Sequence, residues 1–125
     1  MTKILIAEDE KDIRDLVVFS LTYGGFEAIS AANGIEAVAK AEAELPDLIL
    51  MDVRMPKMSG YEACEKLKLN PSTRDIPVVF LSAKGQEAEI RQGLSAGAEE
   101  YILKPFAPDE LVRRVQEILR RTGGG

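Results

Sequence analysis

Short apolar runs alternate along the chain with longer segments in which apolar residues recur every three or four positions. Residues 4–7, 48–51 and 78–81 are continuously apolar, which is typical of central strands in a parallel sheet covered on both faces. Residues 26–30 carry a charge within their run and predict an edge strand. Residues 101–103 form a fifth, shorter candidate.

Amphipathic helices are predicted between and after these strands. The first ends at Gly24-Gly25, and its apolar face consists of Ile13, Leu16, Val17 and Leu21. Three more are predicted over about residues 34–45, 59–69 and 87–96. The last begins near Pro108 and is predicted to bury Leu111, Val115, Ile118 and Leu119. Strand–helix alternation of this kind predicts an α/β class, doubly wound parallel sheet.

The composition is that of one globular domain. The 125 residues are 46% hydrophobic and 30% charged, enough for a core without metal or disulfide support. We expect the domain to span residues 1–121, and the glycine-rich residues 122–125 to form a flexible tail or linker stub. With 16 basic and 21 acidic residues the net charge is −5, which disfavours direct contact with nucleic acid.

The residue types that are missing exclude several kinds of chemistry. The chain has no histidine, which excludes Ser-His and Cys-His nucleophile pairs, histidine-ligated zinc and a phosphohistidine donor role. A single cysteine, Cys64, excludes an internal disulfide and fits a reducing compartment. The first residues lack a signal-peptide layout, and no apolar run approaches membrane-spanning length. We therefore expect a cytoplasmic protein with no membrane partner.

Polar residues follow most of the predicted strands. Glu8 and Asp9 follow the first apolar run, Asp52 follows the third, Ser82 the fourth and Lys104 the fifth. Because ligands bind at the carboxyl ends of parallel strands, we expect these side chains to meet. Each of them alone has an ordinary alternative as a helix cap, a turn residue or a solvated charge. Their recurrence at successive strand ends favours a functional site.

Three carboxylates at one edge would destabilise the fold unless their charge is neutralised. Two like charges about 4 Å apart repel by roughly 4 kcal/mol at an effective dielectric constant of 20. The natural neutraliser is a hard divalent cation with oxygen ligands, and Mg²⁺ fits best. With the metal and Lys104 in place, the pocket would be a receptor for a phosphoryl group, whose transfer depends mainly on positioning and charge neutralisation.

On these residues the chain resembles the receiver domains of bacterial two-component response regulators, the chemotaxis-type fold. The resemblance covers residues 3–121. Its motifs are Glu8-Asp9, residues 47–56, Ser59-Gly60, Leu81-Ser82-Ala83, Gly97-Ala98, Tyr101 and Lys104-Pro105-Phe106. It implies a flavodoxin-like five-stranded sheet of order 2-1-3-4-5 with five helices, and the function of a phosphorylation-controlled signalling switch.

The resemblance also implies a role for each residue at the acidic edge. Asp52 accepts a phosphoryl group from a phosphohistidine of a sensor histidine kinase or phosphotransfer protein. Mg²⁺, or Mn²⁺, is bound by Asp9, Asp52 and the backbone carbonyl of Arg54, and Glu8 acts through a water molecule.

The bound phosphoryl group is expected to be held from the ends of the fourth and fifth strands. The resemblance implies contacts from the Ser82 hydroxyl, the Ala83 backbone N–H and the Lys104 ammonium, and a cis Lys104–Pro105 bond. Because the new dianion is a strong acceptor, Ser82 can move toward it and Tyr101 can swing inward. The alternative for Tyr101 is an aromatic that simply covers the sheet.

Two cations flank the expected phosphoryl position. Arg54 lies two residues after Asp52, and Lys84 lies two residues after Ser82. Both cations could lengthen the phosphoryl lifetime by screening the group from water. The alternative is that both are solvated side chains at a loop rim.

Partner surfaces are expected on two parts of the domain. By resemblance, kinase specificity depends on the first helix, especially residues 12–18. The face formed by the fourth helix, fifth strand and fifth helix binds an effector or a second copy of the chain. Its charged residues are Arg91, Glu99, Glu100, Arg113, Arg114, Arg120 and Arg121.

Three other functions fit parts of the pattern. A haloacid-dehalogenase-type phosphatase would require a second acid where Arg54 stands, and a cap domain as well. A flavin- or nucleotide-binding domain would require a glycine- or hydroxyl-rich loop in place of Glu8-Asp9-Glu10. The main alternative is a phosphorylation-independent interaction scaffold, although all the switch positions hold competent residues. We expect no enzyme activity beyond the chain's own phosphoryl transfer and slow autodephosphorylation.

Overall fold

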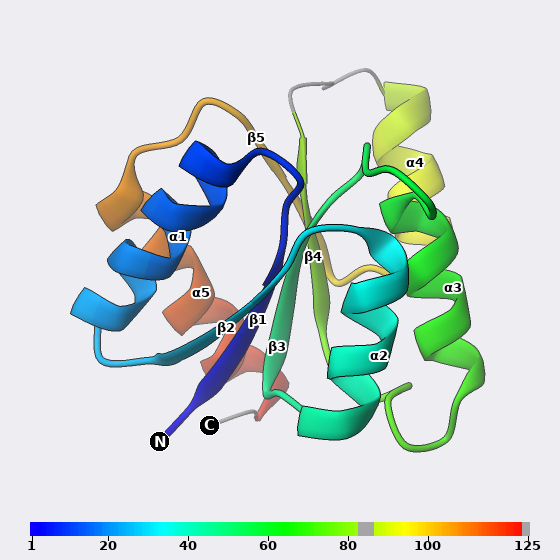
Figure 1. Cartoon of the computed structure of the whole chain (residues 1–125), viewed down its shortest axis with the longest axis horizontal. Coiled ribbons are helices and arrows are strands. Elements are labelled where there is room, and N and C mark those ends of the chain that lie inside the picture. The colour runs from blue at the N-terminus through cyan, green and yellow to red at the C-terminus, as the bar shows by residue number, and fades with distance from the viewer. Residues whose placement is uncertain (83–86, 124–125) are drawn as a thin grey trace.

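The computed structural model describes residues 1–82 and 87–123 and has three layers, with helices on both sides of a sheet (Figure 1). Strands and helices alternate as the apolar pattern predicts. The strands are β1 (Lys3–Ala7), β2 (Glu27–Ala31), β3 (Leu48–Asp52), β4 (Val78–Ser82) and β5 (Glu100–Leu103). The helices are α1 (Lys11–Tyr23), α2 (Gly34–Glu44), α3 (Gly60–Leu69), α4 (Glu87–Ser95) and α5 (Pro108–Thr122).

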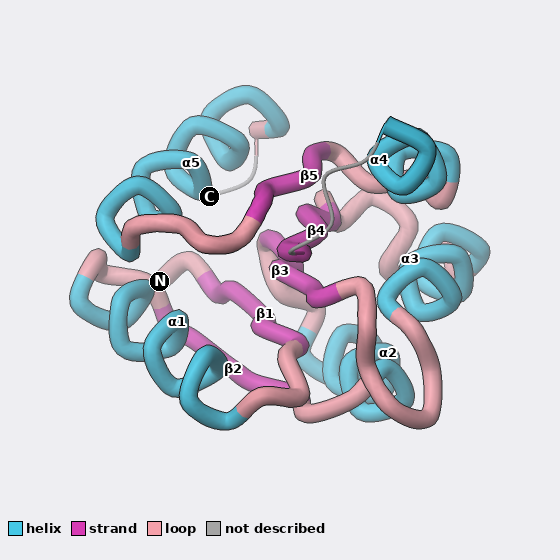
Figure 2. The backbone as a smooth tube through the Cα atoms, turned by 90° about the horizontal axis from the view of Figure 1, so that it is seen from above, coloured by secondary structure: helices cyan, strands magenta, loops and turns pink. Residues whose placement is uncertain are grey.

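The sheet is parallel throughout, with the strand order β2-β1-β3-β4-β5. In Figure 2, α1 and α5 cover one face of the sheet, and α2, α3 and α4 cover the other. The direction in which strands are added reverses between β1 and β3, and in sheets of this kind ligands bind at such a switch point, at the carboxyl ends of the strands. The doubly wound, flavodoxin-like architecture predicted from the sequence is confirmed.

Alternate residues of the central strands enter two separate cores. Ile4 and Ile6 of β1 pack on the side of α1 and α5, whereas Leu5 and Ala7 pack on the side of α2 and α3. Burial on both faces explains why β1, β3 and β4 are continuously apolar. The outer strand β2 is mostly half-buried, which accounts for its mixed sequence.

The buried face of α1 differs from the prediction at Leu16. Val17 and Leu21 are buried, but Leu16 is 48% exposed. Leu16 lies about 100° around the helix from Val17, outside the stripe that faces the sheet. It shares this outer side with Phe19 and Tyr23, which are also exposed and whose rings stack at 6.4 Å.

The last helix agrees closely with its predicted face. Leu111, Val115, Ile118 and Leu119 of α5 are buried, as predicted. The helix continues through Thr122, the first residue of the predicted tail, and Gly123 caps it with a φ of 75°. None of the described helices combines the length and the apolar character needed to cross a membrane.

Candidate functional site

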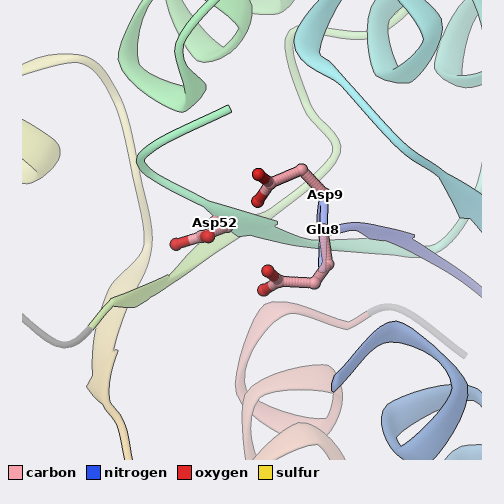
Figure 3. A group of neighbouring side chains, drawn as sticks. All are labelled: Glu8, Asp9 and Asp52. Carbon is pink, nitrogen blue, oxygen red and sulfur yellow. The ribbon is translucent and has the colours of Figure 1, made fainter. Parts of the chain in front are cut away.

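The carboxylates of Glu8, Asp9 and Asp52, here called the acidic trio, lie together at one edge of the sheet (Figure 3). Strand register places the last residues of neighbouring strands among β1, β3, β4 and β5 within one residue of each other, so their carboxyl ends lie at the same edge. Glu8 and Asp9 follow β1, and Asp52 is the last residue of β3. The three carboxylates that were expected to meet at this edge therefore do lie together.

The acidic trio has the chemistry of a hard-cation site. One carboxylate oxygen from each residue lies within 4.8 Å of the others. Glu8 and Asp52 are buried, whereas Asp9 is exposed to solvent. An all-oxygen donor set with one open side suits an ion such as Mg²⁺, which keeps part of its water shell. The residues present therefore fit the metal that the sequence predicts.

Lys104 compensates part of this negative charge. Its Nζ lies 2.8 Å from Glu8 Oε2 and 3.5 Å from Asp52 Oδ2. The lysine follows β5, which lies two strands away from β3 in the sheet. The peptide bond from Lys104 to Pro105 is cis, the isomer that the resemblance implies.

Burial raises the pKa of the Glu8 and Asp52 carboxyl groups above their ordinary values. The Lys104 ammonium opposes this increase at both carboxyl groups. Burial lowers the pKa of Lys104, but the hydrogen bond to Glu8 and the charge of Asp52 outweigh it, so the net direction is upward. Lys104 is thus protonated at neutral pH, and one cation faces three acidic groups.

Asp52 is oriented by its own strand end and faces an open cleft. The backbone N–H of Val53 donates to Asp52 Oδ1 at 2.9 Å, so the second oxygen is the one directed at Lys104. The cleft has a volume of about 510 Å³ and is lined by Asp9, Glu10, Ile13, Asp52, Arg54, Ser82 and Lys104. A phosphoryl-sized group can therefore approach Asp52 from solvent.

Two other predicted residues, Ser82 and Arg54, line this cleft. Ser82 ends β4 and is buried, and Arg54 is exposed at the rim. Tyr101 is half-buried on β5, with its ring 6.2 Å from that of Phe80. Ala83 and Lys84 lie outside the described residues.

Arg14 of α1 makes a contact that was not predicted from the sequence. Its Nη1 donates to the backbone carbonyl of Glu8 at 2.8 Å and to that of Asp9 at 3.4 Å. The available signal was position alone, because Arg14 lies five residues after Asp9, in the first turn of α1, and its long side chain can reach back toward the acidic pair.

The predicted partner face on α4, β5 and α5 carries paired charges. Arg114 lies 2.6 Å from Glu100, and Arg121 lies 3.9 Å from Glu100 and 4.0 Å from Glu99. Basic residues of α5 are thus matched by acidic residues of β5, so this part of the face is not a uniformly basic surface.

Comparison with known proteins identifies the family. The model of the response regulator receiver domain matches residues 4–116. The phosphate regulon transcriptional regulatory protein PhoB of Pseudomonas aeruginosa is 46% identical over 122 residues, which cover 98% of this chain and 53% of PhoB.

Solved structures agree with this match. The chemotaxis protein CheY4 of Vibrio cholerae has a TM-score of 0.91 at 33% identity, covering 95% of this chain and 99% of that chain. The receiver domain of a sensor histidine kinase from Pseudomonas aeruginosa, which has a magnesium ion coordinated in its active site cleft, has a TM-score of 0.87 at 32% identity, covering 98% of both chains.

The chain spans about half the length of the curated relatives that it matches. Its fold, its strand order and its acidic edge agree with those expected from the motifs. The chain belongs to the response regulator receiver domain family, and it functions as a receiver in two-component signalling.

Proposed function

We propose that Asp52 is the phosphoacceptor of this receiver and that its phosphorylation by a sensor histidine kinase or phosphotransfer protein switches the domain. The observation that carries the proposal is the position of the Asp52 carboxylate. It lies at the open end of β3, within 4.8 Å of two further carboxylates and 3.5 Å from the Lys104 ammonium. Such a grouping of charges is costly in a purely structural role.

Asp9, Asp52 and the backbone carbonyl of Arg54 would hold Mg²⁺ or Mn²⁺, with Glu8 acting through a water molecule. The all-oxygen acidic trio supports this assignment. So does the magnesium ion in the active site cleft of the related Pseudomonas aeruginosa kinase receiver. The cation would neutralise negative charge on the carboxylates and on the transferred phosphoryl oxygens.

In the transfer step, an Asp52 oxygen forms a bond to phosphorus while the bond from phosphorus to the donor imidazole nitrogen breaks. The electron pair of the broken bond leaves with the imidazole, which becomes neutral when it is protonated at one nitrogen. Lys104 would then move its interaction from Glu8 and Asp52 toward the phosphoryl oxygens, assisted by the Ser82 hydroxyl and the Ala83 N–H. The chain catalyses only this transfer and a slow hydrolysis of its own aspartyl phosphate.

The switch would pass from Ser82 through Tyr101 to the face of α4, β5 and α5. The Tyr101 and Phe80 rings lie directly beneath α4, since a Cβ added to Gly93 would lie only 3.1 Å from Tyr101 Cδ2 and 3.0 Å from Phe80 Cδ2. Such close packing makes α4 sensitive to the position of the Tyr101 ring. This face would bind an effector or a second copy of the chain.

The phosphoryl donor would dock on the exposed side of α1. A groove of about 330 Å³ is lined there by Ile13, Leu16, Lys104, Pro105 and Phe106. Its apolar residues are continuous with Lys104 of the site, so a bound partner would lie next to the acidic trio.

The single buried cysteine and the family support a cytoplasmic location.

The proposal is tested by exposing the chain to acetyl phosphate with Mg²⁺ and measuring its intact mass. We expect a gain of one phosphoryl group, which is lost on chelation of the metal and in Asp52→Asn. Asp75→Asn removes an exposed carboxylate elsewhere and should still be phosphorylated. A chain that gains no phosphoryl group in any of these conditions would instead support the phosphorylation-independent scaffold.

A further inference from the structure

The backbone of the acidic pair is held from one side by Arg14. The Arg14 guanidinium donates to the carbonyl oxygens of Glu8 and Asp9 at 2.8 and 3.4 Å. These two residues supply two of the three carboxylates of the acidic trio. Arg14 is half-buried, and its contacts are to backbone atoms and therefore do not depend on the side chains at positions 8 and 9.

Other hydrogen bonds hold this segment through its N–H groups and through the Glu8 side chain. The N–H of Glu8 donates to the carbonyl of Ala31 on β2 at 3.0 Å, which extends the strand pairing by one residue. The N–H of Glu10 donates to Glu8 Oε1 at 3.3 Å. Glu10, the residue that caps α1, makes no side-chain capping bond. The turn from β1 into α1 is thus held by strand pairing on one side and by Arg14 on the other.

We infer that Arg14 is a positioning residue of the cation site. By holding the carbonyls of Glu8 and Asp9, it fixes the backbone from which their carboxylates face Asp52. The inference rests on the proposed function, because it concerns the metal-binding part of that site. An arginine suits the task since its planar fork presents several N–H donors in a fixed geometry. Groups that orient metal ligands commonly alter metal affinity.

The positioning role and the charge of Arg14 predict opposite effects of its removal on Mg²⁺ affinity. A guanidinium close to an acidic site repels a divalent cation, so loss of its charge by itself would tighten metal binding. Loss of positioning would weaken metal binding instead. Lys11 provides a matched control, because it is a cation in the first turn of the same helix whose ammonium pairs with the exposed Asp15.

Magnesium binding can be measured by titrating the ¹⁵N-labelled chain and following backbone amide shifts at constant ionic strength. We expect Arg14→Ala to bind Mg²⁺ about tenfold more weakly, the lower end of the range found when ligand-orienting groups are removed. Arg14→Lys should recover part of the affinity, because an ammonium can reach one carbonyl. Lys11→Ala should bind Mg²⁺ as tightly as the unaltered chain or more tightly.

Thermal unfolding of each variant separates positioning from loss of structure. If Arg14→Ala does not fold, Arg14→Lys carries the test, with weaker binding than the unaltered chain as the expected result. Equal or tighter binding by a folded Arg14 variant, while the unaltered chain binds Mg²⁺ normally, would overturn this inference and leave the proposed function standing. If the unaltered chain binds no Mg²⁺, both are overturned.

Discussion

At the scale of single residues, one ammonium group offsets two buried carboxylates. Lys104 lies within 3.5 Å of both Glu8 and Asp52, and the exposed Asp9 adds a third acidic group nearby. Like charges this close in a partly buried site repel by several kcal/mol at most. The metal-free site is therefore under electrostatic strain, which a divalent cation or protonation would relieve.

This charge balance predicts how metal-free stability depends on pH. Burial raises the pKa of Glu8 and Asp52 above 4.5 and 3.8, so the folded chain binds these protons more tightly than the unfolded chain. The two groups therefore make the folded state less stable as pH rises above those ordinary values. The raised pKa of Lys104 contributes stability that is present below 10.5 and is lost only above it.

Because Mg²⁺ binds the deprotonated carboxylates, it should stabilise the chain more at about pH 8 than at about pH 5. Thermal unfolding followed by circular dichroism, with and without Mg²⁺ at matched ionic strength, measures the difference. In Asp52→Asn the gain from Mg²⁺ should be small at both pH values. Equal stabilisation of the unaltered chain at the two pH values would contradict this account of the site.

A second residue-scale prediction concerns Arg54. Its side chain lines the cleft beside Asp52, where it would screen a phosphoryl group from attacking water. Arg54→Asn should hydrolyse its aspartyl phosphate about two- to fivefold faster, since an exposed cation contributes up to ~1 kcal/mol. Loss of phosphorylated mass with time gives the rate.

Lys57→Asn is the matched control for this prediction. Lys57 is an exposed cation of the same loop, does not line the cleft, and has a φ of 70°, which asparagine tolerates. The aspartyl phosphate of Lys57→Asn should hydrolyse at the same rate as that of the unaltered chain. Equal rates in all three proteins would mean that Arg54 is only a solvated side chain.

At the scale of elements, α1 has one apolar side that packs in the core and another that lines the proposed docking groove. Leu21 is completely buried against the sheet, whereas Leu16 is about half-exposed beside the proposed docking groove. Leu21→Ala should lower the free energy of unfolding by about 2–5 kcal/mol. Leu16→Ala should change it by no more than ~0.5 kcal/mol. Urea unfolding measures both, and a large loss in Leu16→Ala would mean that this side of α1 is part of the core.

Helix α4 is tied to α3 by polar contacts at both of its ends. The Tyr61 hydroxyl donates to the Glu89 carbonyl at 3.0 Å, and Cys64 Sγ lies 3.3 Å from the Ala96 carbonyl oxygen. Tyr61→Phe should reduce stability by about 1 kcal/mol and speed amide hydrogen exchange in α4 more than in α1. Tyr23→Phe changes an exposed tyrosine and should alter neither. Unchanged exchange in α4 would show that the hydroxyl does not restrain it.

The elements themselves were largely predictable from the sequence. Unbroken apolar runs identified β1, β3 and β4 because these strands are buried on both faces. The error at Leu16 arose because helical spacing cannot distinguish a residue that packs in the core from one that lines a surface groove. Contacts made by long polar side chains, such as those of Arg14, depend on the turn geometry and had no comparable signal.

At the scale of the whole molecule, the site is a consequence of topology. Residues separated by as many as 96 positions, Glu8 and Lys104, form a hydrogen bond because parallel strands end at one edge. The acidic trio and its lysine could therefore be predicted once the strands were identified. Their distances, and the pairing of α5 arginines with β5 glutamates, required the three-dimensional structure.

The residue that becomes phosphorylated can be identified by chemical trapping. After reaction with acetyl phosphate and Mg²⁺, borohydride reduces an aspartyl phosphate to homoserine, and trypsin releases residues 41–54, which contain Asp47 and Asp52. Tandem mass spectrometry of this peptide should find homoserine at position 52 alone, and only when Mg²⁺ was present. Homoserine at position 47 of this peptide, at position 9 in the tryptic peptide of residues 4–11, or at any position without a divalent cation would contradict the proposed role of Asp52.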